Sequence, residues 1–503
     1  MIEKKLFLAF IIFILTFIVW GVVLKQVPAG EGYTYFSPIY VFWPKGGYVS
    51  VVAHDNSAKL IFDLAEPIFG TNLFLYMLLE VSLLGGLFVA FYFFVLYISK
   101  DGNLSFLATV FFLANYTGLF DMVAAGEYQR FSQRVPIIVF IFVAFYFLIS
   151  YLRGNGLNNL VFSFLTYFGA LLMAQFNSFL MPLFVIFPVV YSFVKKGLSK
   201  SLMISFLIAG TYGSITYYFS QLTELEVTEN KSVIELITSQ GIVKKVFYQI
   251  VVASIPGEIV GKIARVFFGT KILYPYTSVV EILLILILII FAIALFFLYK
   301  RNKKESLIIF ISFFVAMLGS MFLYIYVDDR LNPLTNIGEE RFYFLPAFYL
   351  ALLWAYTFKT IFGNKRVGLL FTCIIAIIYL SYNTSLIWKD ARLNDYKFEP
   401  MRRFISYFQT FPDKFDSNSV LVVPSRLTWP MPFIHKYYLP EGAKFIMAYD
   451  NWEKDYESKK NQVFVFDYEF NLQATKEPRS ADGRLIELTD DYRSGKKIEF
   501  TEN

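Results

Sequence analysis

Residues 6–24 read LFLAFIIFILTFIVWGVVL, a run of 19 residues without one charged side chain. With a rise of about 1.5 Å per residue, an α-helix of that length measures about 28 Å and covers the hydrocarbon core of a bilayer. The run is too long for the apolar region of a signal peptide, and no small-residue cleavage motif follows it. We therefore expect it to remain in the protein as a membrane-spanning helix.

Ten further apolar runs follow along the chain. Of the 503 residues, 57% are hydrophobic and 17% are charged, whereas soluble proteins carry roughly 25% charged residues. This composition excludes a soluble enzyme and a disordered chain. With one cysteine, Cys373, and two histidines, neither an intrachain disulfide nor a Cys/His zinc site, haem or iron–sulfur centre is expected. The sequence predicts an all-α polytopic membrane bundle of eleven spans, at residues 6–24, 73–98, 104–120, 135–152, 159–176, 178–194, 201–219, 276–299, 306–327, 342–358 and 367–387.

The orientation of the spans follows from the basic residues in the short connections, because Lys and Arg gather in cytoplasmic loops. If the N-terminus is cytoplasmic, the inner connections hold 14 basic and three acidic residues. The first outer loop, residues 25–72, holds three basic and four acidic ones. An odd number of spans then places the C-terminus outside. The basic residues counted are Lys4, Lys5, Lys100, Arg153, Lys195, Lys196, Lys200, Lys300, Arg301, Lys303, Lys304, Lys359, Lys365 and Arg366.

The C-terminal tail differs in composition from the rest of the chain. From Lys389 onward, 37 of 115 residues are charged, so we expect a transmembrane domain at 1–387 and a water-solvated, extracytoplasmic domain at 388–503. A helix at 401–409 and four short β-type runs bounded by turn residues predict a small α/β fold there. We interpret His435, in this domain, as structural. The predicted strands are 420–423, 444–447, 463–466 and 484–487.

Residues 56–69 of the first outer loop have an amphipathic pattern, in which Leu60, Leu64 and Ile68 repeat every four positions. The pattern predicts a helix that lies in the plane of the membrane surface above a cavity. An ordinary loop helix packed on the bundle is the alternative. Residues 241–265, where apolar clusters alternate with basic residues, are a candidate for a second interfacial helix.

Glu31 is the first candidate for chemistry. It lies seven residues beyond the first span and is flanked by Gly30 and Gly32, which allow a ligand to approach the backbone closely. A carboxylate at this boundary can act as a general base toward an acceptor hydroxyl. A solvated loop acid is the alternative.

Three other carboxylates are candidates. Asp121 and Glu127, on the second outer loop, could hold a divalent cation (Mg²⁺ or Mn²⁺) or an acceptor hydroxyl, or they could form an ion-pair cluster with Arg134 and its neighbours. Glu80 lies inside the second span, where a carboxylate must be protonated, paired or directed to a polar cavity. Glu80 could have a functional role or form a hydrogen bond between helices, and the sequence does not decide between the two.

Basic residues on the outer side are candidates for a phosphate site. Arg330 and Arg341 flank the entrance to the tenth span, and the planar fork of arginine suits a phosphate that is held and then released. Pairing with the neighbouring acids is the alternative. Arg134 and Lys59 are further candidates for the same role.

Three stretches of the chain resemble the GT-C superfamily of polytopic membrane glycosyltransferases, especially the bacterial relatives of protein O-mannosyltransferases and the lipid-A or arabinan-type sugar transferases. They are Glu31 in the first outer loop, residues 62–79 with the core FGTNLF, and residues 340–346, ERFYFLP. The family commonly has two adjacent acids in the first loop, whereas here Gly32 follows Glu31.

The resemblance implies transfer of a sugar from a polyprenyl-phosphate carrier to an acceptor (protein, lipid or cell-envelope glycan) on the outer face of the cytoplasmic membrane. Glu31 is then the base, assisted by Asp121 or Glu127, and Arg341 and Arg330 bind the carrier phosphate. A transporter of lipid-linked oligosaccharides and a non-catalytic envelope assembly protein remain as alternatives. Membrane lipids are expected partners, nucleic acid is not, and no cofactor is assigned beyond the divalent cation left open above.

Overall fold

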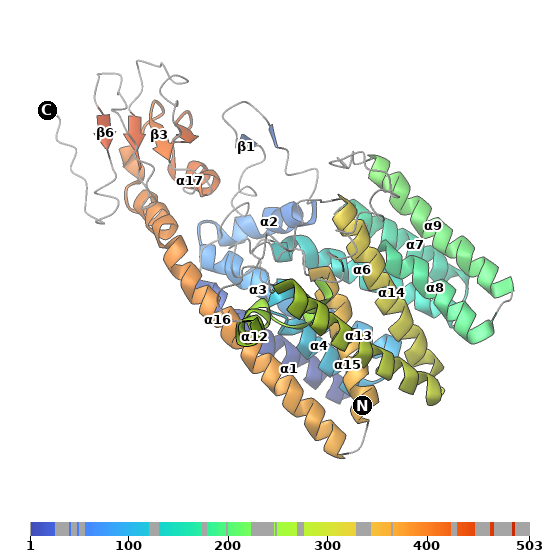
Figure 1. Ribbon diagram of the computed structural model, residues 1–503. Coiled ribbons are helices and arrows are strands. Elements are labelled where there is room, and N and C mark those ends of the chain that lie inside the picture. Colours follow the sequence, from blue (N-terminus) through green and yellow to red (C-terminus); the bar gives the residue numbers. More distant parts are fainter. Residues whose placement is uncertain are drawn as a thin grey trace. The chain divides into compact units, whose positions relative to one another are not determined.

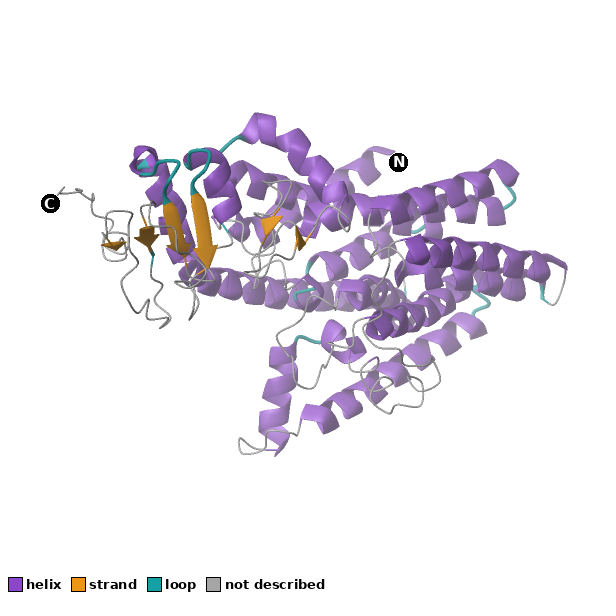
Figure 2. Ribbon diagram, turned by 90° about the horizontal axis from the view of Figure 1, so that it is seen from above, coloured by secondary structure: helices purple, strands orange, loops and turns teal. Residues whose placement is uncertain are grey.

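The computed structural model of the chain describes residues 2–25, 40–41, 48–49, 56–119, 130–173, 179–197, 200–222, 246, 249–268, 276–327, 344–363, 366–423, 430–447, 463–466 and 485–487. This part of the chain is mostly helical, with a few short strands (Figures 1 and 2). Contacts divide the chain into two compact units. The first unit is Met1–Val22, Val81–Asp121 and Phe131–Lys389, and the second is Val23–Glu80, Met122–Arg130 and Asp390–Asn503.

Each of the eleven predicted spans overlaps an α-helix, although the helix of the third span ends at Leu113, seven residues before the predicted end at 120. The helices are α1 (Ile2–Trp20), α3 (Leu73–Ser99), α4 (Gly102–Leu113), α6 (Arg130–Leu152), α7 (Leu157–Met173), α8 (Met181–Lys196), α9 (Lys200–Leu222), α13 (Tyr276–Lys300), α14 (Lys304–Val327), α15 (Phe344–Phe362) and α16 (Arg366–Thr410). Within the described residues, six helices (α1, α3, α9, α13, α14 and α16) are long and apolar enough to cross a membrane. The helices are therefore those of a multi-pass membrane protein, and the count of eleven crossings stays a prediction.

In the first unit, α1 packs closely against its neighbours. A Cβ atom added at Gly85 of α3 would lie 2.8 Å from the ring of Phe13 on α1, so the absence of a side chain permits this approach. The indole of Trp20 donates a hydrogen bond to the carbonyl of Leu113, on α4, at 3.0 Å. Trp388 of α16 likewise donates to the α1 backbone at 3.0 Å. These contacts attach α1 to three other helices.

Aromatic rings fill the centre of the first unit. Phe94 of α3 stacks on Phe142 of α6, with ring centroids 4.5 Å apart, and Phe348 of α15 stacks on the same ring at 5.8 Å. All three side chains are buried. Because aromatic residues make up 20% of the chain, ring packing of this kind accounts for much of the contact between its helices.

Helices α7, α8 and α9 lie alongside one another, and α14 packs on α8 (Figure 1). Two buried polar pairs connect α7 to α9. The hydroxyls of Ser163 and Tyr212 are 2.5 Å apart, and those of Tyr167 and Thr216 are 2.8 Å apart. Hydrogen bonds between buried hydroxyls are a usual means of holding helices together in lipid.

The second unit contains the C-terminal sheet. All four predicted strands are confirmed, as β3 (Val420–Val423), β4 (Lys444–Met447), β5 (Val463–Val465) and β6 (Leu485–Glu487). They form a parallel sheet in the order β4-β3-β5-β6 (Figure 2). Helix α17 (Met431–Tyr438) lies between β3 and β4 in the chain. The described residues of the C-terminal segment thus form a small parallel sheet with one helix between β3 and β4.

The remaining elements are short. A two-stranded antiparallel ladder joins β1 (Tyr40–Val41) to β2 (Tyr48–Val49), and the sequence did not predict it. The predicted helix at 56–69 is present as α2 (Asn56–Phe69), and α12 (Gly257–Phe268) covers part of the second amphipathic segment. Single 3-10 turns occur at Gly21–Lys25, Thr117–Leu119 and Pro412–Lys414.

Helix α16 extends well beyond its predicted span. It runs for 45 residues to Thr410 without interruption, so the predicted helix at 401–409 is its last part. The composition changes at Lys389 and Pro400 follows, but the helix continues through both positions. A change from apolar to charged side chains does not end a helix by itself, because Lys, Arg, Ala and Leu all favour helix. The predicted domain boundary at 387/388 thus falls inside one helix.

Candidate functional site

Most of the predicted site residues lie outside the part of the chain that the structure describes. This applies to Glu31, Asp121, Glu127, Arg330 and Arg341. Lys59 lies on α2 and Arg134 on α6, but their side chains are also outside the described set. The assignments of catalytic and phosphate-binding roles to these seven residues stay predictions.

Two predicted positions are placed by the helices. Arg134 was expected to end the second outer loop, but α6 begins at Arg130, so Arg134 lies on the helix. A span commonly continues beyond the hydrocarbon core, and arginine is tolerated in such a terminal turn because its long side chain reaches the interface. Glu80 lies within α3 and is only 3% exposed, and both roles considered for it stay open.

Within the second unit, α2 packs against the C-terminal α/β domain. Ala65 is buried in the core of that domain, and Phe69 packs on the same cluster, which includes Phe404 of α16, Leu421 of β3 and Phe464 of β5. The first predicted outer loop and the C-terminal tail therefore share one hydrophobic core. This arrangement places both segments on the same side of any membrane that the helices cross.

A polar cluster accompanies this core. The hydroxyl of Tyr437, on α17, donates a hydrogen bond to the Glu66 carboxylate of α2 at 2.7 Å, and Lys436 forms an ion pair with the same carboxylate. Burial and the neighbouring Glu66 carboxylate raise the pKa of the Tyr437 hydroxyl. The hydroxyl therefore stays protonated and acts as a donor. His435, also on α17, lies 3.2 Å from the carbonyl of Ala443, in keeping with a structural role.

The outer face of α2 is apolar. Leu64 is 66% exposed and Ile68 is 77% exposed, whereas Ala65, one position from Leu64, is buried. Exposed leucine and isoleucine on an amphipathic helix are typical of a helix that inserts into a membrane surface. The predicted position of α2 in the interface plane is not tested by this exposure alone.

At one end of the first unit, side chains from separate predicted inner connections meet. The guanidinium of Arg153, after α6, donates to the carbonyls of Tyr97 and Ile98 at the end of α3, at 3.3 and 3.2 Å. Lys195, at the end of α8, forms an ion pair of 3.3 Å with Glu305 at the start of α14. Both contacts join helix ends that the basic-residue pattern assigns to the same side.

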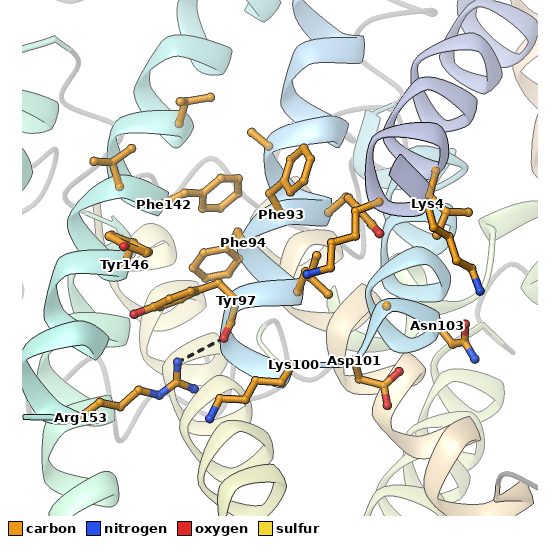
Figure 3. A pocket seen from close by; sticks show the side chains of 18 residues that line it. Lys4, Phe93, Phe94, Tyr97, Lys100, Asp101, Asn103, Phe142, Tyr146 and Arg153 are labelled. Atoms are coloured by element: carbon orange, nitrogen blue, oxygen red, sulfur yellow. Dashed lines mark hydrogen bonds between the residues drawn. The ribbon is translucent and has the colours of Figure 1, made fainter. Parts of the chain in front are cut away.

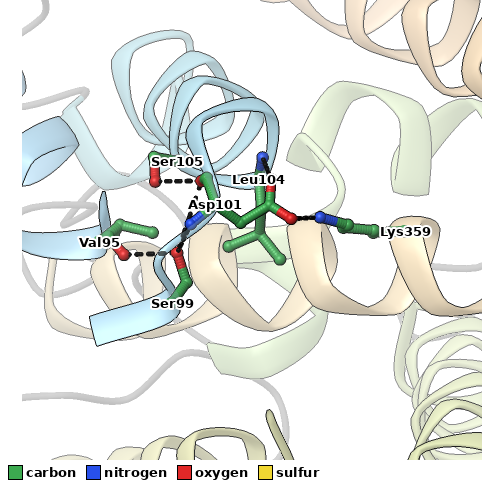
Figure 4. Close-up of polar contacts among 6 residues, drawn as sticks. All are labelled: Val95, Ser99, Asp101, Leu104, Ser105 and Lys359. Atoms are coloured by element: carbon green, nitrogen blue, oxygen red, sulfur yellow. Dashed lines mark hydrogen bonds and ion pairs between the residues drawn. The ribbon is translucent and has the colours of Figure 1, made fainter. Parts of the chain in front are cut away.

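Two more contacts join this end. Arg301, after α13, donates to the carbonyl of Thr360 at 2.9 Å. Asp101 forms an ion pair with Lys359 of α15 and also caps α4, because its carboxylate accepts a hydrogen bond from the Leu104 amide at 3.0 Å (Figure 4). These contacts thus bring together five connections, which follow the second, fourth, sixth, eighth and tenth spans. If inner and outer loops alternate, these five connections are expected on one side.

A cavity of about 1050 Å³ lies at this basic end, among α1, α3, the start of α4 and α6. Its apolar wall is aromatic and its mouth is basic (Figure 3). In Figure 3 the rings of Phe93, Phe94 and Phe142 lie on one side, and Lys100 and Arg153 lie on the other. The sequence predicts that the basic residues lie on the inner side. It does not predict the cavity, because four segments that are separate in the sequence form it.

A comparison with protein-family models found no match for this chain, and a comparison with curated proteins found no similar one. The resemblance to the GT-C superfamily therefore rests on the three short stretches alone. What the helices establish is a bundle of apolar, membrane-type helices with a small parallel α/β domain.

Proposed function

We propose that the chain is a multi-pass membrane glycosyltransferase that moves a sugar from a polyprenyl-phosphate carrier to a protein or glycan acceptor on the outer face. In this reaction the Glu31 carboxylate accepts the proton of the acceptor hydroxyl, and the hydroxyl oxygen bonds to the anomeric carbon. The bond from that carbon to the phosphate oxygen breaks, and the polyprenyl phosphate leaves with the electron pair. The configuration at the anomeric carbon is inverted.

The basic candidates have a defined task in this proposal. Arg341 and Arg330 hold the carrier phosphate, with Arg134 and Lys59 as further contacts, and their charge stabilises the leaving group as it becomes more negative. Asp121 or Glu127 positions the acceptor hydroxyl. The C-terminal domain presents the acceptor.

One observation supports this proposal above the others. Helix α2 of the first outer loop and the C-terminal domain share one core, through Ala65, Phe69 and the hydrogen bond from Tyr437 to Glu66. A transferase of this type requires the first-loop base and the acceptor-presenting domain to act on the same side.

The test is a transfer assay with the full chain in oriented vesicles, supplied with a panel of polyprenyl-phosphate hexoses and pentoses. The variant Glu31→Gln keeps the size of the side chain and removes its basicity, so the initial rate should fall by about 10²–10⁴-fold. Glu281→Gln, which alters an exposed carboxylate on α13, is the matched control and should keep the rate. A folded chain that transfers no sugar from any of these donors contradicts the proposal.

A further inference from the structure

We propose that the cavity at the basic end of the first unit binds one anionic phospholipid, with its phosphate at the mouth and an acyl chain along the aromatic wall. This site is separate from the proposed transferase site, because its charged residues belong to the predicted inner connections. The proposal rests on the charge at the mouth, the nature of the wall and one buried hydroxyl.

The mouth has more positive than negative charge. Lys4, Lys5, Lys100 and Arg153 line the cavity together with a single acid, Asp101. That acid is already engaged by Lys359 and by the Leu104 amide. Among the residues that the structure describes, none of the four basic side chains lies within ion-pair distance of a carboxylate.

Neighbouring charges do not cancel this excess. The carboxylate of Glu305 interacts electrostatically with Lys100 and Arg153, but its ion pair is with Lys195. Arg153 donates to two backbone carbonyls of α3, and carbonyls orient the guanidinium without neutralising it. A monoanionic phosphate is therefore complementary to the mouth.

The apolar wall of the cavity favours a ligand with a hydrocarbon chain. Phe94 and Phe142 are buried and stack on each other at 4.5 Å, while Phe93 and Tyr146 are 38% and 43% exposed and line the same cavity. A free phosphate ion would leave this apolar surface uncovered. An acyl chain buries it, and burial of apolar surface is favourable.

Tyr92 supplies an independent indication of a ligand. Its side chain is fully buried and lines the cavity, yet its hydroxyl has no hydrogen-bond partner among the described residues. Buried hydroxyls are nearly always satisfied. An ester carbonyl of a glycerophospholipid lies between the phosphate and the acyl chain, and a rotation of the Tyr92 side chain toward the cavity would let its hydroxyl donate to that carbonyl.

The experiment is a titration of the purified full chain in non-ionic detergent with phosphatidylglycerol or with phosphatidylcholine of the same acyl chains. Bound lipid is counted by native mass spectrometry. Each basic residue near an anionic lipid contributes about a fivefold change in affinity. We expect saturable binding of one phosphatidylglycerol, weakened about fivefold by Lys100→Gln and further by Lys5→Gln added to it, while binding of phosphatidylcholine stays weak.

Lys303→Gln is the matched control, because Lys303 is exposed on a predicted inner connection but does not line the cavity. This variant should bind phosphatidylglycerol as the unaltered chain does. Tyr92→Phe should weaken binding of phosphatidylglycerol without changing its dependence on charge. Equal affinity for the two lipids, or equal effects of Lys100→Gln and Lys303→Gln, would overturn the proposal.

Two competition arms distinguish the sources of the phosphate. Inorganic phosphate at millimolar concentration should not displace phosphatidylglycerol, and displacement would identify an anion site without a lipid. Polyprenyl phosphate should compete no better than phosphatidylglycerol, and stronger competition would assign the cavity to the carrier lipid instead. None of these results depends on sugar transfer, so the phospholipid site and the proposed transferase function can fail separately.

Discussion

Tyr437 of α17 donates a hydrogen bond of 2.7 Å to Glu66 of α2, across 371 positions of the sequence. The bond joins the first predicted outer loop to the C-terminal domain, and the same carboxylate pairs with Lys436. A hydrogen bond to a charged acceptor stabilises more than a neutral one does. This contact, with the shared core around Ala65 and Phe404, makes two distant segments into one unit.

A double-mutant cycle measures this contact. Tyr437→Phe removes the donor and leaves the ring packing, and Glu66→Ala removes the acceptor. We expect each variant to lower the free energy of unfolding, with a coupling of about 1 kcal/mol between them. Thermal and chemical unfolding of the full chain in detergent provide the measurement. A coupling of zero would mean that the hydrogen bond makes no net contribution.

The orientation of the chain is tested by reporters. Because 14 basic and three acidic residues lie in the predicted inner connections, a reporter fused after Lys304 should be active only in the cytoplasm. One fused after Asn503 should be active only outside. The opposite pattern would place the C-terminal domain and α2 inside, and would remove the basis for an outer transferase site.

Asp101 has two roles, which two variants separate. Asp101→Asn can still cap α4 but cannot form an ion pair with Lys359. The free energy of unfolding should therefore fall by about 0–1 kcal/mol, as for a partly exposed ion pair. Asp101→Ala loses the cap as well and should cost about 1 kcal/mol more. Thermal unfolding gives both values. If the two variants are equally stable, the hydrogen bond to the Leu104 amide does not stabilise α4.

Two neighbouring glycines of α3 should respond differently to alanine. At Gly85 the new Cβ would lie 2.8 Å from the Phe13 ring, whereas at Gly86 nothing lies within 4 Å. Gly85→Ala forces α1 and α3 apart and should cost about 1–3 kcal/mol, as overpacking does. Gly86→Ala should be neutral or stabilising by up to about 1 kcal/mol, because alanine favours helix. The two variants are compared by thermal unfolding, and equal destabilisation would contradict the close approach of the two helices.

The helices and strands could be predicted from the sequence because local patterns specify them. A run such as 6–24 has no charge to solvate and must be buried in lipid or protein, and the four β-type runs between turn residues each became a strand. The end of α16 was harder to predict. Its composition changes at Lys389 and Pro400 lacks an amide N–H, so the sequence favours an end before Thr410, yet the helix continues through both positions.

The tertiary structure alone decided which distant residues meet. The number of basic residues on the inner side follows from the sequence, but the meeting of Lys4, Lys100 and Arg153 at one cavity depends on how α1, α3 and α6 pack. The sequence also could not indicate that Tyr437 is the partner of Glu66, because Tyr437 lies on α17, in a separate predicted domain. Side-chain spacing along one helix reports only the face of that helix, whereas contacts between helices depend on the fit of buried surfaces such as Gly85 against Phe13.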